Sequence, residues 1–128
     1  MILSGKAIRL ALEKDLLKID PFDEAHIQPA HVDLHLGGET ALEVPAKGFV
    51  AAQTKEKITL ANNLCGFMEG RAGLAKQGLS VEQSSTFIEP GSDNHLTLEI
   101  FNASDTPCTL QPGQPIAKLY LAKITDEI

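Results

Sequence analysis

The sequence has 128 residues, of which 43% are hydrophobic, and a formal net charge of -6. This length predicts one domain over residues 1–128, and no apolar run approaches the roughly 20 residues that a membrane span requires. The acidic balance excludes broad binding to a nucleic-acid polymer, which needs clustered Lys and Arg, but it allows a pocket for one small anionic molecule.

The first predicted element is a helix over residues 5–16. Ser4 can serve as its N-cap, and Ile8, Leu12 and Leu16 then fall on one face. Charged residues occur within the first turns, where a signal peptide would have an uninterrupted apolar stretch. We therefore expect a cytoplasmic protein.

From residue 30 onward the pattern changes to short strands and turns. Apolar and polar residues alternate over residues 32–36 and 96–100, as in strands with one buried face. Further strands are predicted at 49–53, 57–60, 65–69 and 116–124. Dipeptides with proline or glycine mark the loops: Asp20-Pro21, Gln28-Pro29, Gly37-Gly38 and Pro112-Gly113. This pattern predicts an all-β sandwich or barrel with one N-terminal helix.

Two sets of residues with metal-binding side chains are interpreted as structural. Cys65 and Cys108 do not make a disulfide framework and form no CxxC pair, which excludes a zinc ribbon. We expect both to be small apolar packing residues. His31, Asp33 and His35 alternate onto one strand face and could in principle bind a metal, but no obvious further ligand lies at short range. A structural or surface role is therefore favoured.

A cation lies between two glycines in segment 69–75, EGRAGLA. Glycine lets the backbone approach a ligand closely and adopt positive φ, and exposed N–H groups in such a loop favour anions. Arg71 could add a charge-assisted hydrogen bond to a phosphate. A surface turn with an ion-paired arginine would give the same local pattern, and the segment alone favours this second interpretation.

Glu99 is the candidate acid–base residue. Within an alternating strand, its side chain points to the opposite face from Leu98 and Ile100. If that face lines a cleft, we expect the pKa of the carboxyl to be raised, which suits general acid–base catalysis. A glutamate on a solvated face is the alternative, and the strand alone favours it.

Taken together in chain order, these segments resemble the dCTP deaminase and dUTPase family over nearly the whole chain. In the N-terminal half the similar segments are 1–4, 19–22, 27–30, 32–34, 36–37 and 59–60. In the C-terminal half they are 69–79, the FIEPG turn at 87–91, the strand 96–99 with Glu99, and the hairpin 112–117.

The resemblance implies a distorted jelly-roll, or dUTPase-like barrel, that assembles into a homotrimer with active sites between subunits. It implies dCTP or dUTP as the ligand, with Mg²⁺ bound through the nucleotide phosphates. In the deaminases, water attacks C4 of cytosine and ammonia leaves, which gives dUTP without a catalytic zinc. This sequence likewise lacks the H-x-E and P-C-x-x-C motifs of the zinc deaminases.

The same resemblance assigns roles to single residues. Glu99 matches the general acid/base, and Ser85 matches the position whose backbone carbonyl helps to hold the water. Glu89 takes the place of an aspartate that faces the sugar in the deaminases and is the base in the dUTPases. The predicted catalytic set is Ala72, Lys76, Ser85 and Glu99, and the predicted nucleotide-binding set is Arg71, Gly73, Leu74, Glu89, Thr97 and Leu98, with no metal ligand.

Departures from the family pattern keep further functions open. Ala72 replaces a serine that helps to position the water, and Lys76 replaces an arginine, whose bidentate fork an ammonium cannot reproduce. The sequence ends at Ile128, before the family's C-terminal segment that contacts the nucleotide and closes over it. Without such a lid we expect weaker binding and more water access.

Two alternatives to a dCTP deaminase follow from these residues. A dUTP diphosphatase would depend on Glu89, although this side chain is one methylene longer than the usual aspartate, and the only tyrosine, Tyr120, does not match the uridine-loop tyrosine. A nucleotide-binding relative that no longer turns over is favoured by Ala72 and Lys76. A purely structural trimeric module remains as the simplest hypothesis.

Overall fold

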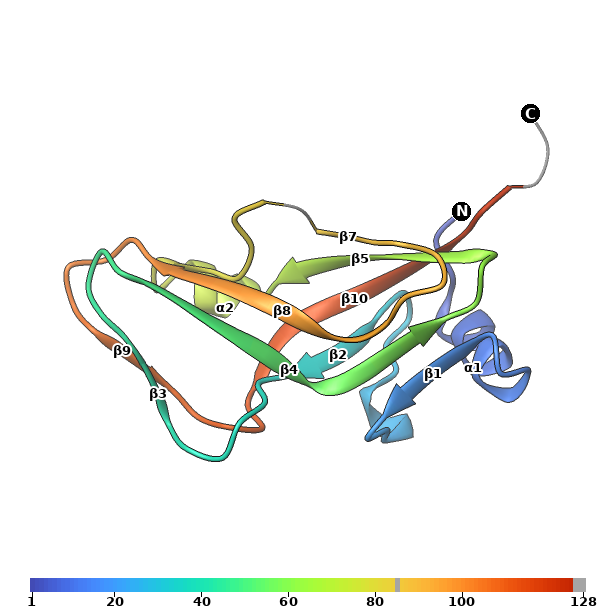
Figure 1. Cartoon of the computed structure of the whole chain (residues 1–128), viewed down its shortest axis with the longest axis horizontal. Coiled ribbons are helices and arrows are strands. Elements are labelled where there is room, and N and C mark those ends of the chain that lie inside the picture. Colours follow the sequence, from blue (N-terminus) through green and yellow to red (C-terminus); the bar gives the residue numbers. More distant parts are fainter. Residues whose placement is uncertain (85, 126–128) are drawn as a thin grey trace.

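The computed structural model describes residues 1–84 and 86–125 of the chain. These residues form two four-stranded antiparallel sheets and a two-stranded ribbon (Figure 1). The first sheet has the order β1 (Leu17–Asp20), β4 (Phe49–Leu60), β8 (Asp93–Asn102) and β6 (Leu79–Ser80). The second has the order β2 (Val32–His35), β10 (Pro115–Lys123), β5 (Leu64–Gly70) and β7 (Phe87–Ile88). The ribbon pairs β3 (Leu42–Val44) with β9 (Cys108–Leu110).

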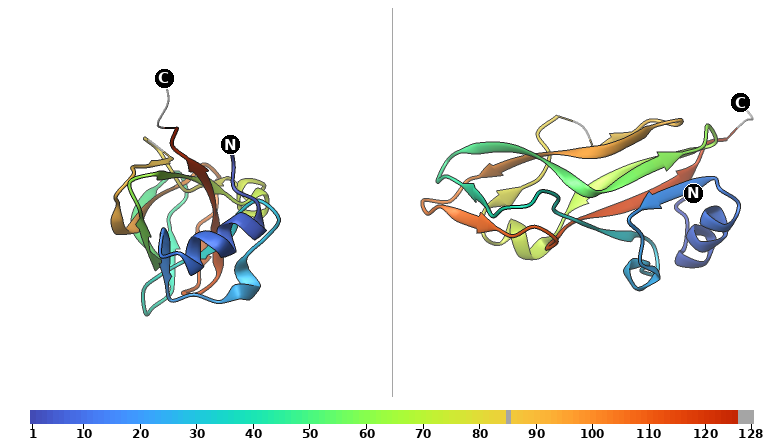
Figure 2. Two further views of the ribbon diagram at one scale, coloured as in Figure 1. Left: turned by 90° about the vertical axis from the view of Figure 1, so that its right-hand side faces the viewer. Right: turned by 60° about the horizontal axis from the view of Figure 1, so that its bottom comes forward.

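The N-terminal helix and the ribbon lie toward opposite ends of an elongated molecule (Figure 1). Helix α1 (Gly5–Glu13) and the 3₁₀ turn η1 (Glu24–His26) lie near β1, and the β3–β9 ribbon extends from the other end (Figure 2). The N-terminal residues run beside the end of β10, where the Leu3 N–H donates to the Leu121 carbonyl at 2.8 Å. A short helix, α2 (Ala72–Ala75), follows β5.

Apolar side chains from the inner faces of both sheets form one core. Leu98 and Ile100 of the first sheet and Leu34, Leu119 and Leu121 of the second are all completely buried in it. Burial of alternate strand residues between two sheets is the arrangement of a β-sandwich. The sequence-based expectation of a mainly β fold with one N-terminal helix is therefore confirmed.

The N-terminal helix is shorter than predicted. Ser4 caps it as expected, since its Oγ accepts from the Ala7 N–H at 3.1 Å. The helix ends at Glu13 rather than at residue 16, because Asp15 adopts a left-handed φ of 57°. Leu17 and the three residues after it form β1, a strand that the sequence did not predict.

Strand β4 is one strand of 12 residues, where the sequence predicted two shorter ones. The register with β8 shifts between Gln53 and Lys57. Thr54 turns inward at this irregularity, where its Oγ1 accepts from the Leu96 N–H at 3.0 Å and donates to the Glu56 carbonyl at 2.7 Å. These side-chain hydrogen bonds compensate for ladder bonds that the bulge interrupts.

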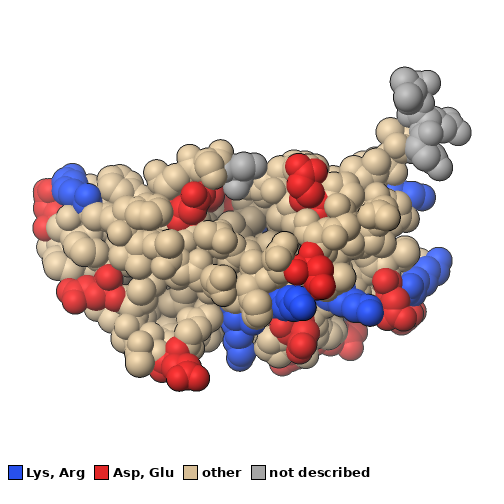
Figure 3. All heavy atoms as spheres, in the orientation of Figure 1, with Lys and Arg blue, Asp and Glu red and all other residues tan. Residues whose placement is uncertain are grey.

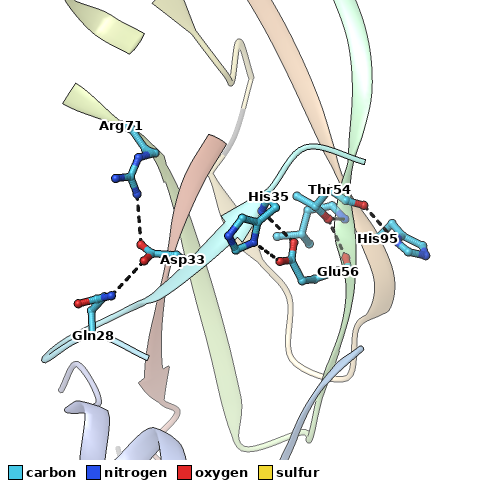
Figure 4. Close-up of polar contacts among 8 residues, drawn as sticks. Gln28, Asp33, His35, Thr54, Glu56, Arg71 and His95 are labelled. Carbon is cyan, nitrogen blue, oxygen red and sulfur yellow. Dashed lines mark hydrogen bonds and ion pairs between the residues drawn. The ribbon is translucent and has the colours of Figure 1, made fainter. Parts of the chain in front are cut away.

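His35 departs from the predicted alternation of strand β2. Asp33 is partly exposed as expected, but His35 is only 8% exposed. Glu56 on β4 of the other sheet is 3% exposed and accepts from the His35 backbone N–H at 2.9 Å and from its Nδ1 at 2.5 Å (Figure 4). The two residues therefore join the sheets through a buried polar contact. Within the described residues, no group of three or more His, Cys, Asp or Glu is placed to hold a metal.

The surface carries charges of both signs. Figure 3 shows acidic and basic side chains intermixed on the face drawn, with no continuous basic surface among the described residues of that face. Cys65 is buried and Cys108 half-buried, and both are free thiols, which agrees with their predicted packing role. No helix in the described part of the chain has the length and apolar character needed to cross a membrane.

Candidate active site

Arg71 follows directly after strand β5 and makes an ion pair within the chain. Its Nη1 donates to Asp33 Oδ1 on β2 at 3.2 Å (Figure 4). Gln28 donates to the other carboxylate oxygen at 3.1 Å. Arg71 is therefore ion-paired, but its partner lies on a strand 38 residues earlier, outside the local turn. The contact of Arg71 with a nucleotide stays a prediction.

The glycines beside Arg71 do not adopt the expected positive φ. Gly70 ends β5, and Gly73 lies in α2 with ordinary helical backbone. A Cβ added at Gly73 would meet no atom within 4 Å, so the packing of this chain leaves open space beside it. Leu74 is 7% exposed and anchors α2 in the core. Its side chain is therefore not available to bind a nucleotide, which is the role predicted for this residue. Only its backbone is left for that role.

Glu99 lies on the outer face of β8, opposite to Leu98 and Ile100, as predicted. With Thr97 it lines a pocket of about 240 Å³, together with Met68, Ser84, Thr86, Phe87, Ile88 and Leu96. Leu98 is completely buried, because alternate residues of a strand point to opposite faces. Its predicted contact with a nucleotide would therefore have to come from the backbone.

The expected rise in the pKa of Glu99 is wrong in direction. Its Oε1 accepts from the Gln83 N–H at 3.2 Å, the Ser84 N–H at 3.3 Å and the Ser84 hydroxyl at 3.0 Å. The pKa of Glu99 is lowered mainly by the Gln83 N–H and then by the two Ser84 donors, which outweigh the opposing effect of burial. These donors favour the carboxylate form of Glu99.

We expect Ser84→Ala to raise the pKa of Glu99 toward its ordinary value, because one of the donors to its Oε1 is lost. If ionised Glu99 is needed for turnover, the acidic limb of a kcat/KM profile will then move to higher pH. Thr109→Ala, which removes an exposed hydroxyl from β9, is the matched control and should leave that limb in place. An unchanged limb in Ser84→Ala would contradict the proposed role of the hydroxyl.

The carboxyl of Glu82 lies near those of Glu69 and Glu99, and sequence reasoning missed its contribution. The pKa of Glu82 is raised, mainly by burial and then by the charges of Glu69 and Glu99. The pKa of the Tyr120 hydroxyl is raised by burial and by Glu69, which also accepts its hydrogen bond. Glu82 carried no sequence signal, because its neighbours in space come from β5 and β8.

We expect Glu82→Gln to raise the melting temperature slightly at pH 7–8, on the order of 1–3 °C. A carboxyl whose pKa is higher in the folded chain destabilises that state when ionised, and the penalty disappears as pH falls through the folded pKa. The gain should therefore shrink toward pH 4. Melting curves of both proteins over this pH range are the measurement, and a gain that grows toward acid pH would show that the sign is wrong.

The remaining predicted residues are spread along the chain. Ala72 and Lys76 are exposed at the two ends of the α2 turn, and Glu89 is exposed in the turn before β8. Ser85 lies outside the described residues. The pocket with Glu99 does not include Arg71 among its described lining residues. A single chain thus brings Thr97 and Glu99 together, and the meeting of Glu99 with Arg71 across a subunit boundary stays a prediction.

Larger hollows occur elsewhere in the described part of the chain. Those of about 370 and 360 Å³ lie beside the bulge of β4 and the end of β2, and one of about 300 Å³ is lined by Met1 and residues 123–125. Their described lining residues include none of the predicted site residues. The pocket beside Glu99 is therefore the candidate active site on chemical grounds rather than on size.

The two sheets, with a carboxylate on a central strand and an arginine after β5, define a jelly-roll protein of the dUTPase type. The fold is similar to that of 2'-deoxycytidine 5'-triphosphate deaminase from Agrobacterium tumefaciens, with a TM-score of 0.79 and 17% identity over 97% of this chain and 48% of that one. This chain thus spans about half the length of the Agrobacterium protein. The fold is also similar to that of EIAV dUTPase, with a TM-score of 0.69 and 21% identity over 88% of this chain and 90% of that one.

The sequence comparisons define the family more closely. The profile of the dCTP deaminase-like family matches residues 41–124. The protein named dCTP deaminase, dUMP-forming, from Rhodococcus erythropolis is 34% identical over 155 aligned positions, which cover 98% of this chain and 82% of the relative. The protein of the same name from Aquifex aeolicus is 32% identical over 149 positions, which cover 97% of this chain and 82% of the relative. The chain belongs to the dCTP deaminase-like family, as its sequence motifs indicated.

Proposed function

We propose that this chain is a nucleotide hydrolase that removes the 4-amino group of dCTP. The observation that carries the proposal is the placement of Glu99, held as a carboxylate on the wall of the pocket by three donors from residues 83–84. Membership of the dCTP deaminase-like family gives the substrate class.

In the proposed reaction, Glu99 removes a proton from a water molecule whose oxygen bonds to C4 of cytosine. The carboxyl transfers this proton to N3, then takes the proton of the new C4 hydroxyl and passes it to the 4-amino group. The C4–N bond breaks, ammonia leaves and the C4 carbonyl of uracil forms. The lowered pKa of Glu99 suits the first of these steps, because a base must be ionised before it can accept a proton.

The product requires a revision of the sequence-based expectation. The sequence predicted dUTP, whereas the curated relatives are named dUMP-forming. We therefore propose that the chain hydrolyses the nucleotide twice, so that one dCTP and two waters give dUMP, ammonia and diphosphate. Glu89, at the position of the dUTPase base, is the candidate for the second hydrolysis. The dUTP diphosphatase hypothesis then becomes the second half of one reaction.

Magnesium enters this proposal with the substrate. The described residues contain no cluster of three or more candidate metal ligands, so Mg²⁺ would be held by phosphate oxygens and water, as is common for nucleotide-bound Mg²⁺. The acidic residues Glu69, Glu82 and Glu99 oppose the approach of a bare polyphosphate. A magnesium complex of dCTP carries less negative charge and would meet less repulsion.

A homotrimer with sites between subunits is part of the same proposal. Its support is that the described residues lining the Glu99 pocket do not include Arg71, so that phosphate and base contacts lie apart on one chain. Sedimentation analysis gives the oligomeric state. Mixing inactive Glu99→Gln and Arg71→Ala subunits should restore part of the activity if each site takes these residues from different chains.

The function is tested by supplying the purified chain with dCTP or dUTP and Mg²⁺ and measuring ammonia, dUTP, dUMP and diphosphate. Ammonia, dUMP and diphosphate in equal amounts from dCTP would support both hydrolyses. Ammonia with dUTP would leave only deamination, and dUMP from dUTP alone would leave only the diphosphatase. No product, combined with a saturable rise in melting temperature on adding dCTP, would favour the binding protein without turnover, which the exposed Ala72 methyl in place of a hydroxyl suggests.

A further inference from the structure

The carboxylate of Asp33 has polar partners in two parts of the chain, the loop just before β2 and the residue after β5. Gln28 Nε2 donates to Oδ2 at 3.1 Å, and His31 Nε2 lies 3.2 Å from Oδ1. Arg71 Nη1 also donates to Oδ1 at 3.2 Å. The Asp33 side chain is only 18% exposed, so its orientation is fixed by these partners. We call Gln28, His31, Asp33 and Arg71 the Asp33 cluster.

The contact between Asp33 and Arg71 crosses an intervening strand. Asp33 lies on β2 and Arg71 follows β5, and β10 runs between these strands in the sheet. Neighbouring strands are about 4.8 Å apart, so the arginine reaches across roughly 10 Å of sheet. The side chain of Arg71 therefore extends over the sheet toward β2 (Figure 4). This orientation depends on the Asp33 carboxylate, which accepts its hydrogen bond.

The backbone of Arg71 is fixed as firmly as its side chain. Its carbonyl accepts from the N–H groups of Leu74 and Ala75, both at 3.1 Å, in the first turn of α2. Leu74 is buried in the core and anchors that turn. Because the backbone and the guanidinium of Arg71 are both held, the side chain loses little conformational entropy when it binds a ligand.

The ion pair leaves most of the guanidinium available. The Arg71 side chain is 36% exposed, and Asp33 takes one of its five N–H donors. Partly exposed ion pairs contribute little to the free energy of unfolding. Stability alone therefore does not explain why Arg71 is paired with Asp33. The remaining donors suit a phosphate, which guanidinium groups bind through parallel hydrogen bonds.

We propose that Asp33, held by Gln28 and His31, is a positioning residue that orients Arg71 toward the polyphosphate of the nucleotide. This inference rests on the proposed function and adds to it a residue that would not touch the substrate. Asp33 also brings a negative charge close to Arg71, which opposes anion binding. The two effects have opposite signs, so the affinity of an Asp33 variant for dCTP distinguishes them.

The test measures dCTP and dCMP binding by titration calorimetry for the full chain and for Asp33→Ala. We expect dCTP binding to weaken roughly tenfold, the effect of freeing one long side chain, with dCMP binding and kcat nearly unchanged. Asp33→Asn keeps an acceptor for Arg71 and should recover part of the loss. Asp105→Ala removes an equal charge from an exposed site elsewhere and should leave dCTP binding unchanged.

The decisive comparison is made in an Arg71→Ala background. If Asp33 acts through Arg71, then Asp33→Ala has no further effect on dCTP binding once the arginine is absent. An equal loss with and without Arg71, or tighter dCTP binding in Asp33→Ala, would overturn the inference and leave the proposed function intact. If the unaltered chain binds neither dCTP nor dUTP, the proposed function fails and this inference fails with it.

Discussion

Replacement of Glu99 by glutamine is expected to lower the kcat for ammonia release from dCTP by roughly 10²–10⁴-fold. The amide of glutamine can still accept hydrogen bonds from Gln83 and Ser84, so the residues that hold position 99 keep their partners. It cannot accept a proton from water, so the proposed first step loses its base. Steady-state ammonia release at saturating dCTP and Mg²⁺ is the measurement.

Several controls separate this chemical effect from a structural one. Glu43→Gln makes the same change at an exposed position on the β3–β9 ribbon and should leave kcat unchanged. The melting temperature and the dCTP affinity of Glu99→Gln should stay close to those of the unaltered chain. Glu99→Gln should also retain diphosphate release from dUTP if Glu89 serves the second hydrolysis. Full ammonia release by this variant would rule Glu99 out as the base.

The sheet core could be predicted from the sequence because alternation reports directly on burial. Leu98 and Ile100 face the core and Glu99 faces outward, as the period of two requires. Strand β1 could not be predicted in the same way. Leu16 and Leu17 continue an apolar pattern that fits a helix equally well, and the change of direction depends on the left-handed backbone at Asp15. No local propensity requires that conformation of an aspartate.

The candidate site was predictable in its residue types but not in its partners. The sequence placed Glu99 on an outward face, but the donors that lower its pKa come from residues 83–84, which follow a different strand. Asp33 was considered with His31 and His35 as a possible metal site, because the three alternate on one strand. In the structure, Asp33 contacts Arg71, whereas His35 contacts Glu56. Pairings between distant segments depend on sheet order, and spacing along the chain does not encode it.

The buried contact between His35 and Glu56 leads to the largest stability effect that we expect. Glu56→Ala should lower the free energy of unfolding by about 3–5 kcal/mol, the usual cost of removing one partner of a buried charged or hydrogen-bonded pair. The lost carboxylate accepts both the backbone N–H and the Nδ1 of His35, and these groups would be left without an acceptor between the two sheets. Urea unfolding at neutral pH measures the difference.

Matched variants show whether burial is the cause. Glu24→Ala breaks the Arg9–Glu24 pair, whose side chains are 47% and 69% exposed, and should cost less than about 1 kcal/mol. If Glu56→Ala does not fold, Glu56→Gln keeps an acceptor in place and allows the loss to be measured. Replacing His35 and Glu56 together by leucine should recover only part of the stability, because both polar side chains are removed but the backbone N–H of residue 35 still lacks its acceptor. A loss below 1 kcal/mol in Glu56→Ala would mean that water reaches His35 through the adjoining 360 Å³ hollow and replaces the carboxylate.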